Sequence, residues 1–446
     1  MERIRLSLTG LLCILMGGNL ARGGPASSPQ PWPVFTTYNS IDLQASVNFC
    51  ITMLGAVEVT PNISVPSSCN AELAWVEFPG SGYQFHFIST PALATDNFSF
   101  PDYVAYVDSL YGNLSTVNSA TYDQFMDFHL GMIVDDMTPY YDALKTSNVP
   151  FFMVGQYPSF FDLFVEIPGT GSILELTSQR LDYPNATISL WDICQEQMEQ
   201  LQQISSPPLS SSRSPPAKPS GDFPQMNWRK TTFAAPYPAM SEAFTIKYLG
   251  AAYTKESHIG VNVKRCAKIA WSELAYDGFE TPAGIPYQFH FVDGFNYLPQ
   301  PPQMGIADFA KYQEANRDFA NDQWDEWANN RLTMWVDDLE PYLDAMQPAH
   351  GAPSFTRAAA ETAESEAKVA AALAAAGNLE IDWVGALEEM PVFPFITRRW
   401  EDDSLFAMII DITPIAGHVL ELISDSFPSE KYALPKVWDF CNEGSA

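Results

Sequence analysis

The segment HLGMIVDDMTPYYDALKTSNVPFF at residues 129–152, followed by LFVEIPGTGSILELT at residues 163–177, decides the fold of this chain. HLGMIV is typical of a strand, and the next residues predict a helix that Asp135 or Asp136 can cap and that has Pro139 near its first turn. LFVEI and ILELT flank the turn PGTG, as two strands joined by a turn do. The segment therefore predicts a strand, a helix and then further strands.

The same pattern returns later in the chain, as RLTMWVDDLEPYLDAM at residues 331–346 and VLELIS at residues 419–424. An earlier word, YQFHF, likewise occurs twice, at residues 83–87 and 287–291. Because the matching words come in the same order, they describe one folding unit used twice. Every difference between the two copies thus becomes a comparison within one molecule.

The chain of 446 residues is longer than a single hydrophobic core usually holds, and 46% of its residues are hydrophobic. We expect two domains that pack on each other, at residues 33–196 and 233–444. The Pro- and Ser-rich residues 197–232 between them predict an exposed linker. The second copy also contains an Ala- and Glu-rich insertion at about residues 355–380, with no chemistry visible in it.

The net charge of −30, from 53 acidic and 23 basic residues, opposes binding to nucleic acid or to an anionic membrane surface. Arg3 and Arg5 precede the apolar run from Leu6 to Met16, which is the layout of a secretory signal peptide over residues 1–24. The run is too short to span a bilayer comfortably, so we expect a secreted or luminal protein with no membrane partner. Sequons agree with this location and predict glycosylation at Asn62, Asn97, Asn113 and Asn185.

Cysteine placement supports the same location. The repeat selects two disulfides, one in each copy: Cys69 with Cys194, and Cys266 with Cys441. Each ties the C-terminal tail of a domain to its middle. Cys50 is left over, and its counterpart in the second copy is Thr245, so we expect a buried free thiol rather than a catalytic one.

Both copies resemble the vicinal oxygen chelate superfamily, which includes glyoxalase I, extradiol dioxygenases and bleomycin-resistance proteins. The resemblance rests on residues 129–152 and 163–177 and on SIDLQASVNFCITMLGA at residues 40–56, which is similar to the Asp-Leu, helix, Leu-Gly signature that opens such a domain. It implies an α+β fold of two tandem domains, each a pair of βαβββ modules whose curved sheets form a cup with any metal at its centre. It indicates a fold more specifically than a reaction, because the superfamily hosts many chemistries on one scaffold.

The resemblance implies that metal ligands come from the first and last strands of the two modules of a domain. Transferred to the first copy, these positions fall on Phe35 or a neighbour, His86, His129 and Glu175. The opening position departs from the pattern, because no His, Gln or Glu occurs in VFTTYNSID. His86, His129 and Glu175 remain as a two-His, one-carboxylate set that suits iron(II), manganese or zinc. Glu175 would also act as the catalytic proton acceptor.

Structural interpretations stand beside this one. A histidine on a mixed strand is more often a hydrogen-bonded core or rim residue than a ligand, and His86 recurs as His290 in the same Phe-His-Phe word. The aspartate pairs at residues 135–136 and 337–338 are typical of helix capping rather than of metal binding.

The corresponding trio in the second copy is His290, Arg331 and Glu421. A guanidinium cannot bind a cation, yet it can occupy the same space and neutralise the glutamate through a salt bridge. We therefore expect a degenerate second site that an Arg331–Glu421 pair closes, and any chemistry in the first copy.

Two functions follow from these features. The first is a secreted, glyoxalase- or dioxygenase-like enzyme, a metal-dependent lyase or dioxygenase that acts on a small oxygen-chelating substrate in the first domain. The missing first ligand and the secretory address argue against glyoxalase I chemistry itself. The second is a secreted protein without metal that binds a small ligand, or serves as a scaffold, and does not catalyse a reaction.

Elemental analysis separates these two functions. The enzyme hypothesis predicts stoichiometric iron, manganese or zinc in the purified wild-type protein, and its loss in His129→Ala because one of three ligands is removed. A wild-type protein without stoichiometric metal would instead favour the binding function.

Overall fold

The computed structural model describes these residues of the chain: 31–59, 71–89, 94–95, 98–111, 129–156, 160–182, 189–190, 226–235, 238–253, 269–274, 287–292, 317–318, 323–324, 330–346, 393–400 and 403–437. The predicted signal peptide and the Ala-rich insertion lie outside them, as do the four sequons and the four paired cysteines: Asn62, Asn97, Asn113, Asn185, Cys69, Cys194, Cys266 and Cys441.

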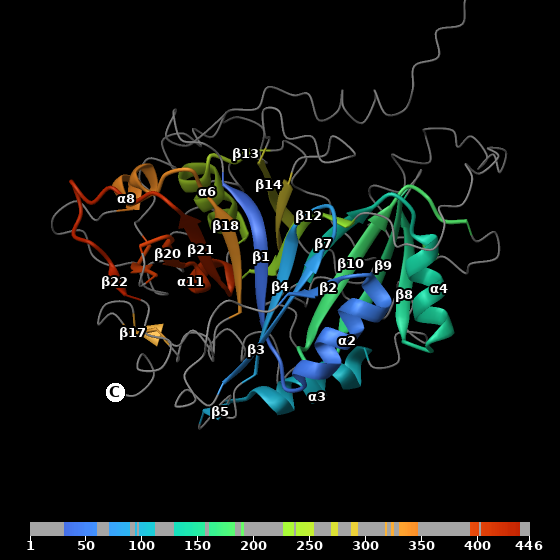
Figure 1. Cartoon of the computed structure of the whole chain (residues 1–446). Coiled ribbons are helices and arrows are strands. Elements are labelled where there is room, and N and C mark those ends of the chain that lie inside the picture. The colour runs from blue at the N-terminus through green and yellow to red at the C-terminus, as the bar shows by residue number, and fades with distance from the viewer. Residues whose placement is uncertain are drawn as a thin grey trace, which may run out of the picture.

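Four modules with the predicted order of strand, helix and further strands make up most of the described chain (Figure 1). Modules 1 and 2 belong to the first copy of the repeat, and modules 3 and 4 belong to the second. Module 1 contains β1 (Trp32–Asn39), α2 (Leu43–Leu54), β2 (Val57–Val59), β3 (Glu72–Phe78) and β4 (Tyr83–Ser89). Module 2 contains β7 (His129–Val134), α4 (Thr138–Thr146), β8 (Phe151–Gln156), β9 (Phe160–Ile167) and β10 (Ser172–Ser178).

The second copy repeats this order. Module 3 contains β12 (Met226–Ala234), α6 (Pro238–Leu249), β13 (Ala252–Tyr253), β14 (Ile269–Leu274) and β15 (Tyr287–Val292). Module 4 contains β18 (Arg331–Trp335), α8 (Glu340–Met346), β19 (Phe395–Arg399), β20 (Phe406–Asp411), α11 (Thr413–Ala416) and β21 (Val419–Ser424). The smaller elements are β5 (Ala94–Thr95), β6 (Phe98–Ser99), α3 (Phe100–Tyr111), β11 (Ser189–Leu190), β16 (Arg317–Asp318), β17 (Gln323–Trp324) and β22 (Lys436–Val437). Because β12 begins at Met226, the predicted end of the linker at residue 232 is too late.

Local signals set the helix ends as the sequence indicates. The Asp42 carboxylate accepts a hydrogen bond from the Ala45 amide at 2.9 Å, so α2 begins with a capped amide. The same helix ends at Gly55, whose φ of 72° lies in the left-handed region that favours glycine. At the start of α4, the aspartate that accepts a hydrogen bond is Asp136, from the Thr138 amide at 2.9 Å.

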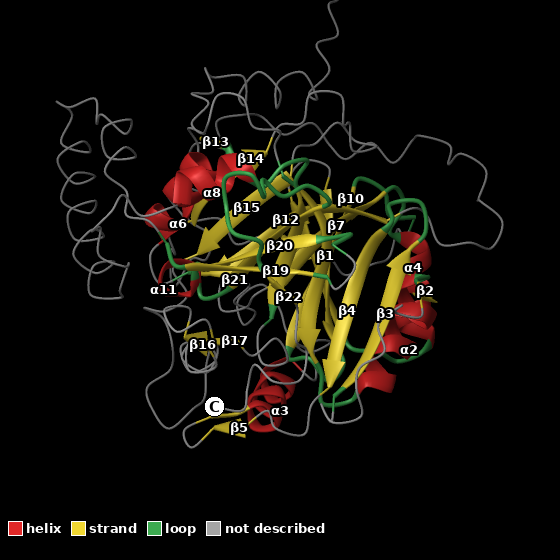
Figure 2. Cartoon of the chain, turned by 60° about the vertical axis from the view of Figure 1, so that its left-hand side comes forward, coloured by secondary structure: helices red, strands yellow, loops and turns green. Residues whose placement is uncertain are grey.

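The four modules form two nine-stranded sheets, and each sheet takes one module from each copy (Figures 1 and 2). In the first sheet the strand order is β2-β3-β4-β1-β18-β21-β20-β19-β22, so module 1 joins module 4. In the second sheet the order is β11-β8-β9-β10-β7-β12-β15-β14-β13, so module 2 joins module 3. Both joints are antiparallel pairs of first strands, β1 with β18 and β7 with β12.

This arrangement confirms part of the expected fold and corrects another part. The α+β class, the two curved sheets and the two βαβββ modules in each sheet are as the resemblance implies. The pairing differs, because a cup built within one copy would have joined modules 1 and 2 by their edges. All four modules begin with a strand whose outer edge is open, so the sequence pattern does not specify which of these edges meet.

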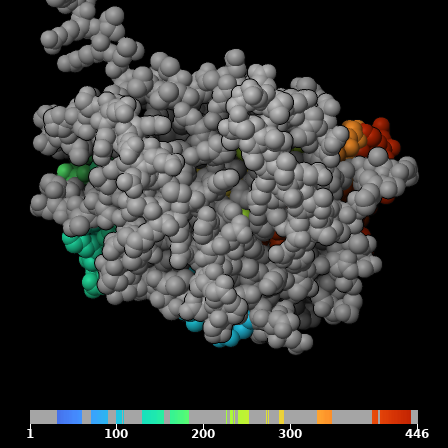
Figure 3. All heavy atoms as spheres, turned by 180° about the vertical axis from the view of Figure 1, so that it is seen from behind, coloured from blue at the N-terminus to red at the C-terminus, as the bar shows by residue number. Residues whose placement is uncertain are grey.

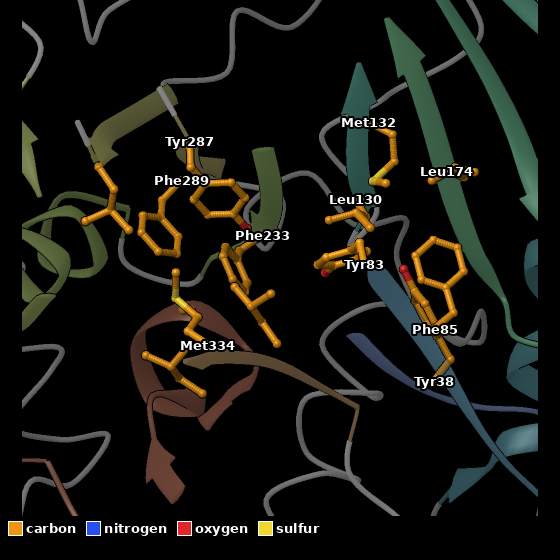
Figure 4. Close-up of a cluster of buried hydrophobic side chains, with 14 of the residues drawn as sticks. Tyr38, Tyr83, Phe85, Leu130, Met132, Leu174, Phe233, Tyr287, Phe289 and Met334 are labelled. Carbon is orange, nitrogen blue, oxygen red and sulfur yellow. The ribbon is translucent and has the colours of Figure 1, made fainter. Parts of the chain in front are cut away.

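The two modules of one copy pack face to face instead. Figure 4 shows Tyr83 and Phe85 of the first sheet beside Leu130 and Leu174 of the second, and all four belong to one buried hydrophobic core. The core of the first copy therefore lies between the two sheets, on the face of each that is opposite to its cup.

Matching contacts fix the two modules of each copy to each other. The Ser46 hydroxyl donates to the carbonyl of Pro168 at 2.6 Å, and the Ser241 hydroxyl donates to the carbonyl of Ile415 at 2.8 Å. Cys50 lies on α2 as a buried free thiol, which confirms the prediction for that residue. Burial raises the pKa of this thiol, so it is unreactive in the folded protein.

The concave faces of the two sheets point away from each other, because each sheet turns its other face to the shared core. In the view from behind, the described surface of module 2 in turquoise and that of module 4 in orange to red lie on opposite sides of the molecule (Figure 3). Within the described residues, no helix has the length and apolar character needed to cross a membrane.

We expect neither copy to be stable as a monomer when it is expressed alone. A fragment of residues 31–196 would leave the edges of β1 and β7 unpaired, and unpaired edges favour association. Size-exclusion chromatography with light scattering should show a 1:1 complex when this fragment is mixed with residues 226–446. A folded, monomeric first copy that does not bind the second would contradict the pairing across copies.

Candidate functional site

The concave face of each sheet gathers polar side chains at the joint between its two modules. We call the face centred on β7 and β12 the β7/β12 cup, and the face centred on β1 and β18 the β1/β18 cup. Side chains alternate between faces along a strand, so cup residues lie between core residues. On β10, for example, Glu175 lies between Leu174 and Leu176 of the core.

A buried carboxylate binds two basic side chains in the β7/β12 cup. Nζ of Lys230 lies 2.8 Å from Oε2 of Glu175, and Nε2 of His129 lies 3.2 Å from the same oxygen. Burial alone would raise the pKa of Glu175, but the Lys230 ammonium and the hydrogen bond from His129 outweigh it and hold this pKa well below its usual range. The glutamate is therefore ionised, as one half of an internal ion pair.

Gly131 gives Lys230 its route to the glutamate. Strand β7 lies between β12 and β10, and the register places Lys230 opposite Gly131 and Gly131 opposite Glu175. A Cβ atom at Gly131 would lie 2.5 Å from Cγ of Lys230, which is closer than two non-bonded carbon atoms approach in proteins. Glycine at this position therefore lets the lysine side chain cross β7.

A second carboxylate extends the polar network of this cup. The Thr177 hydroxyl donates to Oδ1 of Asp162 at 2.8 Å and lies 3.4 Å from Oε1 of Glu175. All three side chains are fully buried. The hydroxyl therefore links the two carboxylates into one network with Lys230 and His129.

The β1/β18 cup contains the same kind of centre, built from different residues. Arg331 donates from Nε to Oε2 of Glu421 at 2.9 Å, and the Thr333 hydroxyl donates to the same oxygen at 2.6 Å. The predicted contact between Arg331 and Glu421 is thus present. The same face of module 4 also carries a buried apolar cluster of Ile396, Ala407, Ile409, Val419 and Ile423 and the buried side chain of Arg398.

His86 is fixed between two aromatic rings in the β1/β18 cup. Its ring centroid lies 3.9 Å from that of Phe35 and 4.0 Å from that of Trp75, and Nε2 lies 2.9 Å from Oε1 of Gln84. Burial, and then the charge of Arg331, lowers the pKa of His86 well below its usual value, so the ring is neutral. His86 is therefore a packed and hydrogen-bonded residue of this cup.

The structure divides the predicted metal set. His129 and Glu175 lie in contact in the β7/β12 cup, whereas His86 lies on β4 of the other sheet. The prediction that His86, His129 and Glu175 form one metal site is therefore wrong as a grouping. The physical reason is the sheet pairing, which joins module 1 to module 4 rather than to module 2.

The second trio is divided in the same way. Arg331 and Glu421 meet in the β1/β18 cup, whereas His290 lies on β15 in the β7/β12 cup. There the register places Thr232 opposite both His290 and His129, so the threonine stands between the two histidines. Of the predicted second trio, only Arg331 and Glu421 therefore lie together.

Lys230 is not among the residues predicted from the sequence, although a comparison of the two copies points to it. The word FTTYN at residues 35–39 aligns with KTTFA at residues 230–234. The register confirms the equivalence, because Phe35 pairs with Gln84 and Lys230 pairs with Gln288 in the same word of the repeat. Lys230 thus stands at the position equivalent to Phe35, where the first copy lacks a metal ligand. A basic residue at that position is the feature of the sequence that points to Lys230.

Among the described residues, neither cup offers the donor set that a divalent metal requires. In each cup a basic side chain binds the central glutamate oxygen, so a metal at that oxygen would face a positive charge at close range. No three His, Cys, Asp or Glu side chains converge as metal ligands in the part of the chain that the structure describes. The iron, manganese or zinc that the resemblance implies therefore does not fit these residues.

Solved structures that are similar to this chain include glyoxalase I from Zea mays, at 9% identity with 89% of this chain and 92% of that chain covered and a TM-score of 0.42. A glyoxalase/bleomycin resistance protein/dioxygenase domain from Frankia sp. EAN1pec is 15% identical, with 34% and 92% covered and a TM-score of 0.22. A protein of the same description from Nocardioides is 13% identical, with 41% and 100% covered and a TM-score of 0.22. At these identities and TM-scores the similarity carries no conclusion about the function of this chain. No protein-family model and no curated protein matches the chain.

Lys230→Met should destabilise the protein by about 3–5 kcal/mol, since it leaves the buried Glu175 carboxylate without its strongest partner. Adding Glu175→Gln should recover most of that loss, because the uncompensated charge disappears. Urea denaturation measures both changes. Lys145→Met, at an exposed position of α4, is the matched control and should change the free energy of unfolding by less than about 0.5 kcal/mol. Equal losses in the single and double variants would show that the ion pair does not stabilise the cup.

Proposed function

We propose that this chain is a secreted, metal-free and non-catalytic protein that binds a small molecule on a fold of the glyoxalase and dioxygenase type. The observation that carries the proposal is the basic side chain bound to the central glutamate of each cup, Lys230 on Glu175 and Arg331 on Glu421. Such a side chain supplies the positive charge that a buried carboxylate needs, which is the role that a metal would otherwise have.

Two different positions supply the cation. Lys230 stands in β12 where Phe35 stands in β1, and Arg331 stands in β18 where His129 stands in β7. Each cup thus binds a cation to its central glutamate from the side of the first strand, but from a different residue position. Agreement between two unlike arrangements supports a requirement for a cation bound to the central glutamate in both.

The side chains of the β1/β18 cup support the binding of a small molecule. Phe35, Trp75 and Trp335 are only partly buried, although they lie on the concave face of a sheet. Trp335 also stacks on Trp32, at 6.4 Å between ring centroids. Concave surfaces with aromatic side chains and a few polar groups are typical of small-molecule sites.

Secretion is proposed from the sequence alone. The leader over residues 1–24, the four sequons and the two pairs of cysteines are consistent with one compartment, the secretory lumen.

A metal-dependent lyase or dioxygenase is the second candidate, and one observation favours it. His129 and Glu175, two of the three predicted ligands, lie 3.2 Å apart through Nε2 and Oε2. This function would require Lys230 to leave Glu175 and a further ligand to take its place. It ranks second because that exchange would separate a buried ion pair.

Thermal unfolding with and without EDTA tests the proposed function. We expect the midpoint to be the same in both, and added Zn²⁺ or Mn²⁺ to leave it unchanged, because a ligand that does not bind the folded state does not stabilise it. Lys230→Met serves as the comparison, since it releases the Glu175 carboxylate and His129 for a metal and should acquire a metal-dependent rise. A wild-type midpoint that falls in EDTA and recovers with one of these ions would favour the enzyme.

A further inference from the structure

Strand β1 presents buried polar atoms that the protein itself does not satisfy. Among the described residues, no hydrogen-bond partner reaches Oγ1 of Thr37, or Oδ1 and Nδ2 of Asn39. Thr37 is 1% exposed and Asn39 is 0% exposed. A buried polar group without a partner costs free energy, so native structures keep very few of them.

Both side chains point to the β1/β18 cup. Thr36 and Tyr38, which alternate with them along β1, face the core: the Thr36 hydroxyl is 2.6 Å from that of Tyr83, and Tyr38 contacts the ring of Phe85. Thr37 and Asn39 therefore lie on the opposite, concave face. The three unsatisfied atoms form one polar spot on that face.

The second copy of the repeat holds this spot in place. Thr37 lies between His86 on β4 and Arg331 on β18. The backbone amide of Asn39 donates to Oδ1 of Asn330 at 2.7 Å, which fixes the end of β1 but leaves the Asn39 side chain uninvolved. The spot is thus built on paired strands rather than on a loop.

The other cup has only half of this arrangement. Thr232, at the position equivalent to Thr37, is also buried and also has no hydrogen-bond partner among the described residues. Ala234 stands where β1 has Asn39. The combination of a hydroxyl and a carboxamide is therefore specific to the β1/β18 cup.

We infer that Thr37 and Asn39 bind a small neutral ligand that presents a hydrogen-bond donor and an acceptor side by side on an aromatic ring, such as an aromatic carboxamide. This inference rests on the proposed binding function and names the class of ligand. A carboxamide offers the complement of Asn39, since its N–H group meets Oδ1 and its carbonyl meets Nδ2.

Charge and shape select against other classes of ligand. The Arg331 guanidinium beside Thr37 is already neutralised by Glu421, so this side chain offers an anion no unbalanced positive charge. A carboxylate, which only accepts hydrogen bonds, would also leave Oδ1 of Asn39 unsatisfied. The partly buried rings of Phe35 and Trp75 next to the spot favour a flat, apolar body.

A titration of the full-length protein with benzamide, monitored by ligand-observed NMR, tests the inference. We expect saturable binding of benzamide, and binding of benzoate and toluene weaker by about tenfold or more, because benzoate lacks the donor and toluene lacks both the donor and the acceptor. Thr37→Val and Asn39→Leu should weaken benzamide binding by a similar factor. Thr232→Val removes the equivalent hydroxyl of the other cup and should leave the affinity unchanged.

The thermal midpoint without ligand provides a second readout. Thr37→Val should unfold at the wild-type temperature or above it, since the substitution removes an unsatisfied hydroxyl and keeps the shape of the side chain. A lower midpoint would show that the hydroxyl has a structural partner and would overturn the inference. Equal binding of benzamide, benzoate and toluene, or no binding of any of them, would also overturn it and would assign the polar spot to water.

The metal content of the same sample separates this inference from the proposed function. A metal-free protein that does not bind benzamide would contradict the ligand class alone. Stoichiometric metal in the protein would contradict the proposed function, whatever the titration shows.

Discussion

The antiparallel pairing of first strands across the two copies is the constraint on which the rest of the structure depends. β1 pairs with β18, and β7 pairs with β12, so each cup takes one wall from each copy. Lys230 reaches Glu175 only because β12 lies beside β7. Arg331 lies beside Thr37 for the equivalent reason. Without these two joints Lys230 would not reach Glu175 and Thr37 would not lie beside Arg331, although each copy would keep its face-to-face core.

The two cups show that the cation bound to the central glutamate can come from different strands of the same sheet geometry. The residue opposite the glutamate on the neighbouring strand then differs as well. Where the cation comes from the adjacent strand, position 131 is glycine and the lysine crosses above it. Where the cation is Arg331 of β18 itself, the equivalent position is Thr333, whose hydroxyl donates to Glu421. A buried ion pair contributes little net stability, whereas the loss of one partner is costly. The main effect of such a pair is therefore to restrict which sequences can adopt this fold, and its net contribution to stability is small.

Much of the local structure could be predicted from the sequence, because it depends on nearest neighbours along the chain. The cap at Asp136, the end of α2 at Gly55 and the burial of Cys50 are of this kind. The contact of Arg331 with Glu421 could also be predicted, since both residues lie in one module. The separation of His86 from His129 and Glu175 could not, because it depends on which of four similar strand edges meet. Lys230 was hidden for the same reason, as its partner Glu175 lies in the other copy.

The hydrogen bond from Asn39 to Asn330 joins residues that are 291 positions apart, and it has a consequence for biosynthesis. A chain is made from its N-terminus, so β1 and β7 are complete long before the strands that cover their edges exist. Contacts over such a distance also slow folding, because a long loop must close before they form. The nascent first copy therefore carries two open strand edges through translation, and chaperones that shield such edges would find their binding sites at β1 and β7.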